Sequence, residues 1–523
     1  MLRRLLLSLA ACLTYGFSPP ATFGQVSKQG LLSAEGAQRA GLTRMWFTHL
    51  EMDSSRGKMQ GVTQHVSNTQ AHTVFEVTFQ SRSYLFSERD LDAFGNPVGV
   101  EGAKEAADKK VAGLTLAATP AEKPAAAADP AAAPADAKPA PAAELPKVSM
   151  HVIPEITVYA TSERGLVHAI DGETGKTKWA SFVGDPRFPT SNCGASDDVV
   201  CVFNGSKIYV LKASDGTVNW EKSVPGAPVL GPAVSEEYIF VPLISGKVDV
   251  YQVGFPNRAA STFRTMGRPT TQPVILNHSV AWATDRGHVY VGSVNDGKPK
   301  YRVETKDNVV STPGFLPPDK IFVTSQDGYL YSVRETRGGI NWRFSTGESI
   351  SHGPIGVRDT VYVIADSGTM YAIDGEAGVE RWTTSGIRGF IAATDDRLYC
   401  TDITASLVVI DSRSGSRVAS ISAPELEVRM VNTETDRIIV GTPSGLLQCF
   451  REIGRKWPEV RMMQDSGPRK KATVEIKEEG GKAKPAIDDS KPAEDDPFAK
   501  PAGGAKTPAA DMPADPADPF GGK

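Results

Sequence analysis

A pattern of about 40 residues recurs between Val148 and Trp457, and it constrains the fold more than any other feature of the chain. Each copy holds a strand-like run, a tight turn, a second alternating run and a polar turn that ends at an aromatic residue. The clearest copies are VYATSERGLVHAIDGETGKTKW, VCVFNGSKIYVLKASDGTVNW, AWATDRGHVYVGSVNDGKPKY, IFVTSQDGYLYSVRETRGGINW and VYVIADSGTMYAIDGEAGVERW. One copy has the length of a four-stranded sheet, which buries its two faces only by stacking against its neighbours.

The first turn of each copy gives a count of the repeats. These turn residues follow one another at steps of 37 to 41 and are Gly165, Ser206, Gly246, Gly287, Gly328, Gly368, Ala405 and Gly445. Glycine suits the position because a tight hairpin needs a positive φ. Eight turns predict an all-β, eight-bladed β-propeller, with seven blades as the alternative because the last copy has no clear second turn.

The aromatic residues that end the copies are predicted to dock each blade on the next one. Trp179, Trp220, Tyr301, Trp342 and Trp382 all keep one offset from their turn residue. A buried aromatic side chain covers about 150–250 Å², which is a large share of the contact between two blades. The third copy lacks this ending, and the seventh has alanine at the aromatic position.

The segment AIDGETGKTKW, from Ala169 to Trp179, resembles the tryptophan-docking motif of pyrroloquinoline-quinone (PQQ)-dependent alcohol dehydrogenases. Similar repeats occur in the BamB family of outer-membrane assembly lipoproteins. The resemblance spans the repeated region and implies a propeller of PQQ-like repeats. The PQQ enzymes also carry adjacent cysteines and calcium ligands, whereas this chain has no Cys-Cys pair and no position that matches those ligands.

The resemblance therefore implies a non-catalytic propeller that binds protein partners in the cell envelope, as BamB does in outer-membrane protein assembly. We expect no cofactor, no metal site and a monomer. Two alternatives stay open, a PQQ-dependent dehydrogenase and a sensor that binds a small molecule in the propeller channel. The near-balanced net charge of −4 leaves no basic field to gather phosphates, which argues against a nucleic-acid partner.

The first residues predict export. Arg3 and Arg4 precede an apolar run that ends near Phe17, and we interpret residues 1–24 as a signal peptide. The run LAAC also resembles a bacterial lipobox, in which Cys12 would carry lipid and provide the only membrane anchor. Either cut places the protein in the periplasm or at the outer membrane.

The remaining segments differ sharply in composition. Residues 41–66, with Trp46 in an alternating run, are predicted to close the ring beside the last blade. Residues 67–115 read as a small α+β insertion of strands and one helix. The Ala/Pro-rich linker at 116–147 and the tail at 464–523, which holds two Asp-Pro-Phe copies, are expected to be disordered. The propeller itself is assigned to residues 148–460.

Other chemical signals have plainer structural explanations. Cys193, Cys201, Cys400 and Cys449 have no metal-ligand spacing and are predicted to be buried core residues rather than disulfides. The eight histidines are scattered and show no zinc spacing. The glycines of GETGKT fit a hairpin turn better than a phosphate loop.

Overall fold

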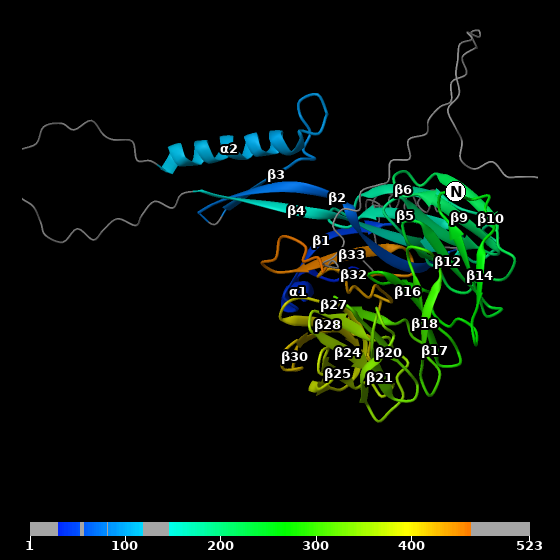
Figure 1. Cartoon of the computed structure of the whole chain (residues 1–523). Coiled ribbons are helices and arrows are strands. Elements are labelled where there is room, and N and C mark those ends of the chain that lie inside the picture. The colour runs from blue at the N-terminus through cyan, green and yellow to red at the C-terminus, as the bar shows by residue number, and fades with distance from the viewer. Residues whose placement is uncertain (1–29, 53–56, 81, 119–145, 462–523) are drawn as a thin grey trace, which may run out of the picture. The chain divides into compact units, whose positions relative to one another are not determined.

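The computed structural model describes residues 30–52, 57–80, 82–118 and 146–461. These residues form eight sheets, seven of four strands and one of five, together with the helices α1 (Ala34–Arg39) and α2 (Gly99–Ala118) (Figure 1). The expected all-β propeller is confirmed. The described part of the chain contains eight sheets, which equals the number of turn residues counted over all copies of the repeat.

The first four sheets follow the chain in order. The first sheet contains β3 (Arg82–Ser87), β2 (Met59–Phe79), β4 (Lys147–Ser162), β5 (Leu166–Asp171) and β6 (Thr177–Phe182). The second contains β7 (Gly194–Ala195), β8 (Val199–Asn204), β9 (Lys207–Lys212) and β10 (Val218–Ser223). The third contains β11 (Ala233–Val234), β12 (Tyr238–Leu243), β13 (Lys247–Gln252) and β14 (Ser261–Arg264). The fourth contains β15 (Val274–Ile275), β16 (Ser279–Ala283), β17 (His288–Ser293) and β18 (Pro299–Glu304).

The last four sheets repeat the arrangement. The fifth contains β19 (Gly314–Leu316), β20 (Lys320–Thr324), β21 (Tyr329–Arg334) and β22 (Ile340–Ser345). The sixth contains β23 (Ile355–Val357), β24 (Thr360–Ile364), β25 (Met370–Asp374) and β26 (Glu380–Thr384). The seventh contains β27 (Ile387–Ala393), β28 (Arg397–Asp402), β29 (Leu407–Asp411) and β30 (Arg417–Ile421). The eighth contains β31 (Val428–Arg429), β32 (Ile438–Gly441), β33 (Leu446–Glu452) and β1 (Leu42–His49).

Alternation along the strands places apolar side chains at both faces of each sheet. In β8, Val199, Cys201 and Phe203 pack with the third sheet, whereas Val200 and Val202 pack with the first. Successive side chains of a strand point to opposite faces, so a strand between two neighbours is apolar at nearly every position. This is why the repeats read as apolar runs rather than as a simple alternation of polar and apolar residues.

The core is divided into eight hydrophobic clusters, each lying between two neighbouring sheets. Seven of them join sheets that are consecutive in the chain. The eighth joins the last sheet to the first, where Trp46, Ile439 and Leu447 pack with Val158 and Ile170. The described sheets therefore stack into a closed ring.

The strand β1 is the outermost strand of the last sheet. It pairs antiparallel with β33, and the register places Trp46 opposite Cys449 (Figure 1, blue beside orange). One sheet thus combines residues from near both ends of the described chain. The interpretation of residues 41–66 as a segment that joins the last sheet applies to β1, but the segment also includes the start of β2, which belongs to the first sheet.

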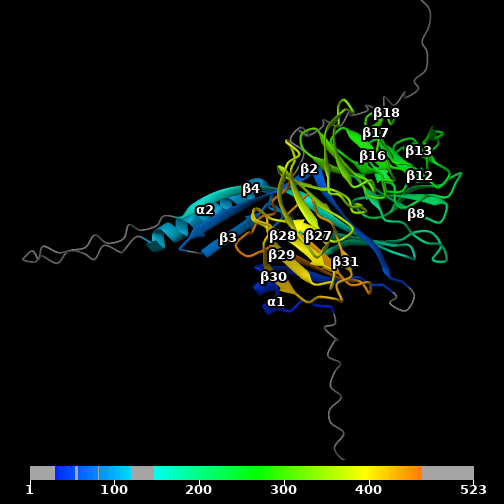
Figure 2. The same cartoon turned by 90° about the horizontal axis from the view of Figure 1, so that it is seen from below.

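The α+β insertion differs from the expected separate unit. The strand β2 runs without interruption through the expected boundary at 66/67, and β4 is similarly long. The first half of β2 and the second half of β4 belong to the ring, while their other halves extend beyond it and pair with each other. The second half of β2 also pairs with β3 on its other side. The helix α2 contacts β2 and β3, as Figure 2 shows, and its Ala103 and Ala107 pack on Phe75 and Val77. The helix is also longer than its expected end at 115.

No helix in the described part of the chain is long and apolar enough to cross a membrane.

Candidate functional site

The aromatic residues that end the repeats lie against the next sheet. The side chains of Trp179, Trp220 and Trp382 donate hydrogen bonds to carbonyls of the following sheet, at Ala213 (2.8 Å), Val253 (3.1 Å) and Ser412 (2.9 Å) respectively. The Tyr301 hydroxyl donates to the Glu335 carbonyl at 2.8 Å. The Trp342 N–H is buried and has no acceptor among the described residues.

A glycine of the next sheet lies under most of these rings. A Cβ added at this glycine would lie only 2.4–2.6 Å from a ring atom, in the pairs Trp179–Gly216, Tyr301–Gly338, Trp342–Gly378, Trp382–Gly415 and Trp46–Gly175. Each of these glycines also has a positive φ. The turn therefore needs glycine for its backbone shape and for the close approach of the ring.

Trp46 was not predicted to be one of these docking residues. Its indole N–H donates to the Gly172 carbonyl at 2.8 Å, so it occupies in the last sheet the place that Trp179 occupies in the first. The repeat could not show this, because Trp46 comes from β1 and stands more than 100 residues before the first copy. An aromatic in an alternating run was the only signal.

The predicted turn glycines have the expected backbone. Gly165, Gly287, Gly328, Gly368 and Gly445 all have φ between 71° and 101°. In the second copy the positive φ falls on Gly205 and not on the predicted Ser206, because the turn is shifted by one residue. Ala405 keeps a positive φ of 62° without being glycine.

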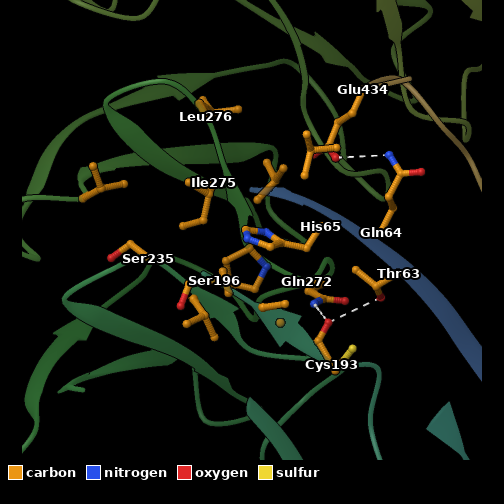
Figure 3. A pocket seen from close by; sticks show the side chains of 18 of the residues that line it. Thr63, Gln64, His65, Cys193, Ser196, Ser235, Gln272, Ile275, Leu276 and Glu434 are labelled. Carbon is orange, nitrogen blue, oxygen red and sulfur yellow. Dashed lines mark hydrogen bonds between the residues drawn. The ribbon is translucent and has the colours of Figure 1, made fainter. Parts of the chain in front are cut away.

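A cavity of about 540 Å³ lies where the first strands of several sheets meet (Figure 3). Its walls come from β2, β7, β11 and β15 and from the segment around Glu434 and Arg461. Figure 3 shows His65, Gln64 and Thr63 of β2 reaching toward it from one side. The sequence offered no signal for this cavity, since its lining residues are scattered over almost 400 positions.

His65 and Asp197 form the most polar pair of the cavity wall. The His65 Nε2 atom lies 2.8 Å from Asp197 Oδ1, and Thr69 donates to Asp197 Oδ2 through its amide (3.1 Å) and its hydroxyl (2.6 Å). Burial alone would raise the pKa of Asp197, but these hydrogen bonds outweigh it and hold the pKa well below its usual range. Asp197 is therefore a fixed negative charge that is already bound by its neighbours.

A second polar group joins β2 to the turn before β32. The side-chain amides of Gln64 and Asn432 exchange hydrogen bonds (3.3 and 3.2 Å), and Asn432 also donates to the Thr435 hydroxyl at 2.7 Å. Glu434 is surrounded by protein, which raises the pKa of its carboxyl, although its side chain stays exposed to the cavity interior. The wall thus offers both hydrogen-bond donors and hydrogen-bond acceptors.

The thiols give the cavity no reactive nucleophile. Cys193, Cys201, Cys400 and Cys449 are free and buried, and burial raises the pKa of Cys193 to about 12. A thiol with such a pKa stays protonated and is a poor nucleophile at neutral pH. Within residues 30–461, as far as they are described, no cluster of His, Cys, Asp or Glu could hold a metal ion. The chemistry this wall supports is hydrogen bonding to a polar group.

A second feature lies at the end of the sheets where the predicted turns are found. Exposed apolar side chains follow one another there across the first four sheets, each between 48% and 53% exposed: Phe188, Leu230, Ile244 and Met266. We call these four residues the apolar rim. Hydrogen bonds hold its loops together, from the Ile244 amide to the Ala227 carbonyl (3.0 Å) and from Thr265 to Gly246 (2.9 Å).

Next to the apolar rim is an open hollow of about 620 Å³. Its lining includes Ile244 together with Arg268, Asp285 and Arg286. Exposed apolar groups beside arginine are typical of the surfaces at which proteins bind one another. The sequence did not predict the apolar rim, because single apolar residues in loops have no pattern.

Several predictions lie outside the described residues. They are the signal peptide at 1–24, the lipidation of Cys12, most of the linker at 116–147, and the tail with its Asp-Pro-Phe copies.

A family model described as outer membrane protein assembly factor BamB matches residues 142–307 and 326–448, which is more than half of the chain. The protein of this name from Yersinia pestis is 24% identical over 286 residues, covering 50% of this chain and 62% of its own length. That from Salmonella typhimurium is 33% identical over 94 residues, or 16% and 24% of the two chains. The serine/threonine-protein kinase AfsK of Streptomyces griseus is 24% identical over 243 residues, which cover 43% of this chain and 29% of the kinase. The matches thus span less than two thirds of each relative's length.

Among solved structures, BamB from Moraxella catarrhalis has a TM-score of 0.49 at 15% identity, over 57% of this chain and 92% of its own. The computationally designed Ika8 protein has a TM-score of 0.47 at 13% identity, over 56% and 93%.

Proposed function

This chain belongs to the outer membrane protein assembly factor BamB family of PQQ-like repeat propellers, and from that membership we propose an exported, non-catalytic scaffold for outer-membrane protein assembly. In this proposal the protein works as a monomer in the periplasm or at the outer membrane, and its partners are other proteins of the cell envelope. The closed ring provides a rigid support, and its loops provide the contacts.

The apolar rim is the observation that carries the proposal. Four half-exposed apolar side chains lie in loops of the first four sheets, and hydrogen bonds from Ile244 to Ala227 and from Thr265 to Gly246 brace the loops around Ile244. Arg268 and Arg286 stand beside them at the open hollow. A buried apolar centre with arginine at its edge is the usual composition of a protein interface.

The cavity walled by β2, β7, β11 and β15 supports the non-catalytic part of this proposal, because two of its groups, a carboxylate and a thiol, are not free to react. Its carboxylate Asp197 is bound by His65 and Thr69, and its thiol at Cys193 is protonated.

A second candidate is a small polar ligand in the cavity. The volume of about 540 Å³ is within the range of small-molecule sites, and Gln64, Gln272 and Glu434 line it. This function is compatible with the scaffold, because the cavity and the apolar rim are separate surfaces.

The test is capture of partners from detergent-solubilised cell envelopes by the full chain. The wild type is expected to recover outer-membrane assembly components, and the double variant Leu230→Asp with Ile244→Asp is expected to lose them. Phe255→Asp is the matched control, since Phe255 is 66% exposed but lies in the β13–β14 connection, at the opposite end of β13 from Ile244. Capture of no envelope protein, or equal capture by the double variant, would contradict the proposal.

A further inference from the structure

Glu434 is a carboxylate of the cavity wall without a cation beside it. Its Oε2 atom accepts a hydrogen bond from the Gln64 amide at 3.5 Å, as Figure 3 shows. Among the described residues, no lysine or arginine forms an ion pair with it. A charge that protein encloses is unfavourable unless an opposite charge or several donors face it. Glu434 therefore leaves a place for a cation that enters the cavity.

The two side chains of the lining that can carry positive charge face other partners. His65 Nε2 lies 2.8 Å from Asp197 Oδ1. Arg461 Nε lies 3.6 Å from Glu459 Oε1, and the amino nitrogens of Arg461 donate to backbone carbonyls. Asp197 and Glu459 thus balance these two side chains, whereas Glu434 has no ion pair of its own in the described part of the chain.

Apolar side chains form part of the same lining. They include Val66, Val234, Val274, Ile275 and Val431. Val431 lies three residues before Glu434 in the chain and is 59% exposed, so it has apolar surface to offer to a ligand. Figure 3 shows Ile275 on the other side of His65 from Glu434. The cavity of about 540 Å³ therefore combines an unpaired carboxylate with apolar surface.

An organic cation matches this lining better than a metal ion does. Metal ions in proteins take about four to eight ligands, and in the described chain no group of three or more His, Cys, Asp or Glu side chains is placed to hold one. An ammonium group carries a single positive charge on N–H donors, so one carboxylate can bind it through charge-assisted hydrogen bonds. The apolar part of the lining then needs an apolar body on the same ligand.

We propose that the cavity binds a small primary amine with an apolar body. The ammonium group of the amine donates hydrogen bonds to Glu434, and the apolar body lies against Val431 and Ile275. The Gln64 amide holds the carboxylate through its own hydrogen bond. The proposal rests on the second candidate of the proposed function, the small-ligand site, and gives that ligand its chemical class. It does not depend on the scaffold role, because the cavity lining and the apolar rim share no residue.

Calorimetric titration of the full chain at pH 7 with 2-phenylethylamine tests this. We expect saturable binding at one site per chain, about tenfold tighter or more than binding of 2-phenylethanol, which has the same apolar body without the charge. Glu434→Gln keeps the shape of the side chain and should weaken amine binding about tenfold or more, with little change for the alcohol. Glu304→Gln is the matched control, because Glu304 pairs with Arg302 on the surface, outside the cavity lining. A thermal unfolding transition like that of the wild type shows that Glu434→Gln is folded.

Several results would overturn the amine. Equal affinities of the wild type for the amine and the alcohol, or equal amine binding by the wild type and Glu434→Gln, would mean that the site does not select positive charge. Tighter binding of phenylacetate would mean that His65 or Arg461 makes it an anion site. If none of the three probes binds, the small-ligand candidate fails as well. The scaffold role is tested separately, since the double variant Leu230→Asp with Ile244→Asp should bind the amine as the wild type does.

Discussion

Arg437 forms a two-pronged ion pair with Glu173, from Nε to Oε1 at 2.9 Å and from an amino nitrogen to Oε2 at 2.8 Å. Arg437 belongs to the last sheet and Glu173 to the turn after β5 in the first, so the pair spans the junction where the ring closes. Trp46 binds the neighbouring Gly172 carbonyl in the same turn. Two side chains of the last sheet therefore hold one turn of the first.

We predict that Arg437→Met lowers the free energy of unfolding by about 3–5 kcal/mol, because it leaves the buried Asp436 carboxylate without its cation. Urea unfolding followed by tryptophan fluorescence measures this. Arg413→Met is the control: Arg413 pairs with Asp396 on the surface, and exposed pairs contribute about 0–1 kcal/mol. Equal losses in the two variants would show that the junction does not depend on the pair.

The docking tryptophans allow a second comparison. Trp382→Phe and Trp342→Phe remove similar amounts of ring, but only Trp382 donates a hydrogen bond, to the Ser412 carbonyl. We expect Trp382→Phe to cost about 1 kcal/mol more than Trp342→Phe in the same unfolding measurement, because one carbonyl loses its donor. Equal losses in the two variants would mean that ring area alone determines the docking energy.

Two adjacent glycines test the turn beneath the rings. Gly338 has a φ of 69°, and an added Cβ would lie 2.5 Å from Tyr301 Cδ2, whereas Gly339 would meet nothing within 4 Å. Gly338→Ala should lower the free energy of unfolding by about 2 kcal/mol or more through strain and displacement of the ring. Gly339→Ala should stay within about 1 kcal/mol of the wild type. Thermal unfolding of the two variants and the wild type measures these losses, and equal losses in the two variants would contradict the prediction.

The sequence predicted the sheets because their determinants are local. A positive-φ turn such as Gly328 and an alternating run such as β8 are fixed by residues within one repeat, and the repeat shows them several times. The continuity of β2 through residue 66 was missed, because its two halves pair with different parts of one strand far along the chain.

The candidate sites were less predictable for the same reason. His65 and Asp197 are 132 residues apart and meet only when β2 joins the first sheet and the second sheet packs beside it. Trp457, which follows the last copy of the repeat, packs on His151 of the extended β4. Contacts of this kind have no period, so a single sequence gives no signal for them.

The acid dependence of stability follows from Asp197. In the folded state, hydrogen bonds from His65 and Thr69 hold the pKa of Asp197 well below the usual value near 4, although burial opposes this. In acid the unfolded chain therefore binds more protons at this carboxyl than the folded chain does. Its contribution is complete above about pH 4 and is lost as pH falls toward the lowered folded pKa.

Thr69→Ala removes one hydrogen bond from this carboxylate and should cost about 1–2 kcal/mol at pH 7. It should also make the acid loss smaller and end it at a higher pH, because the folded pKa of Asp197 rises when the bond is gone, while the loss still begins near the unfolded pKa. In Asp197→Asn the stability at pH 7 should be lower still, while the further loss between pH 5 and pH 3 becomes smaller than in the wild type, since the titrating group is absent. Urea midpoints at pH 7, 5, 4 and 3 measure both effects. Parallel curves for the wild type and Asp197→Asn would place the acid sensitivity on other carboxylates, because a group that does not titrate cannot change the slope of stability with pH.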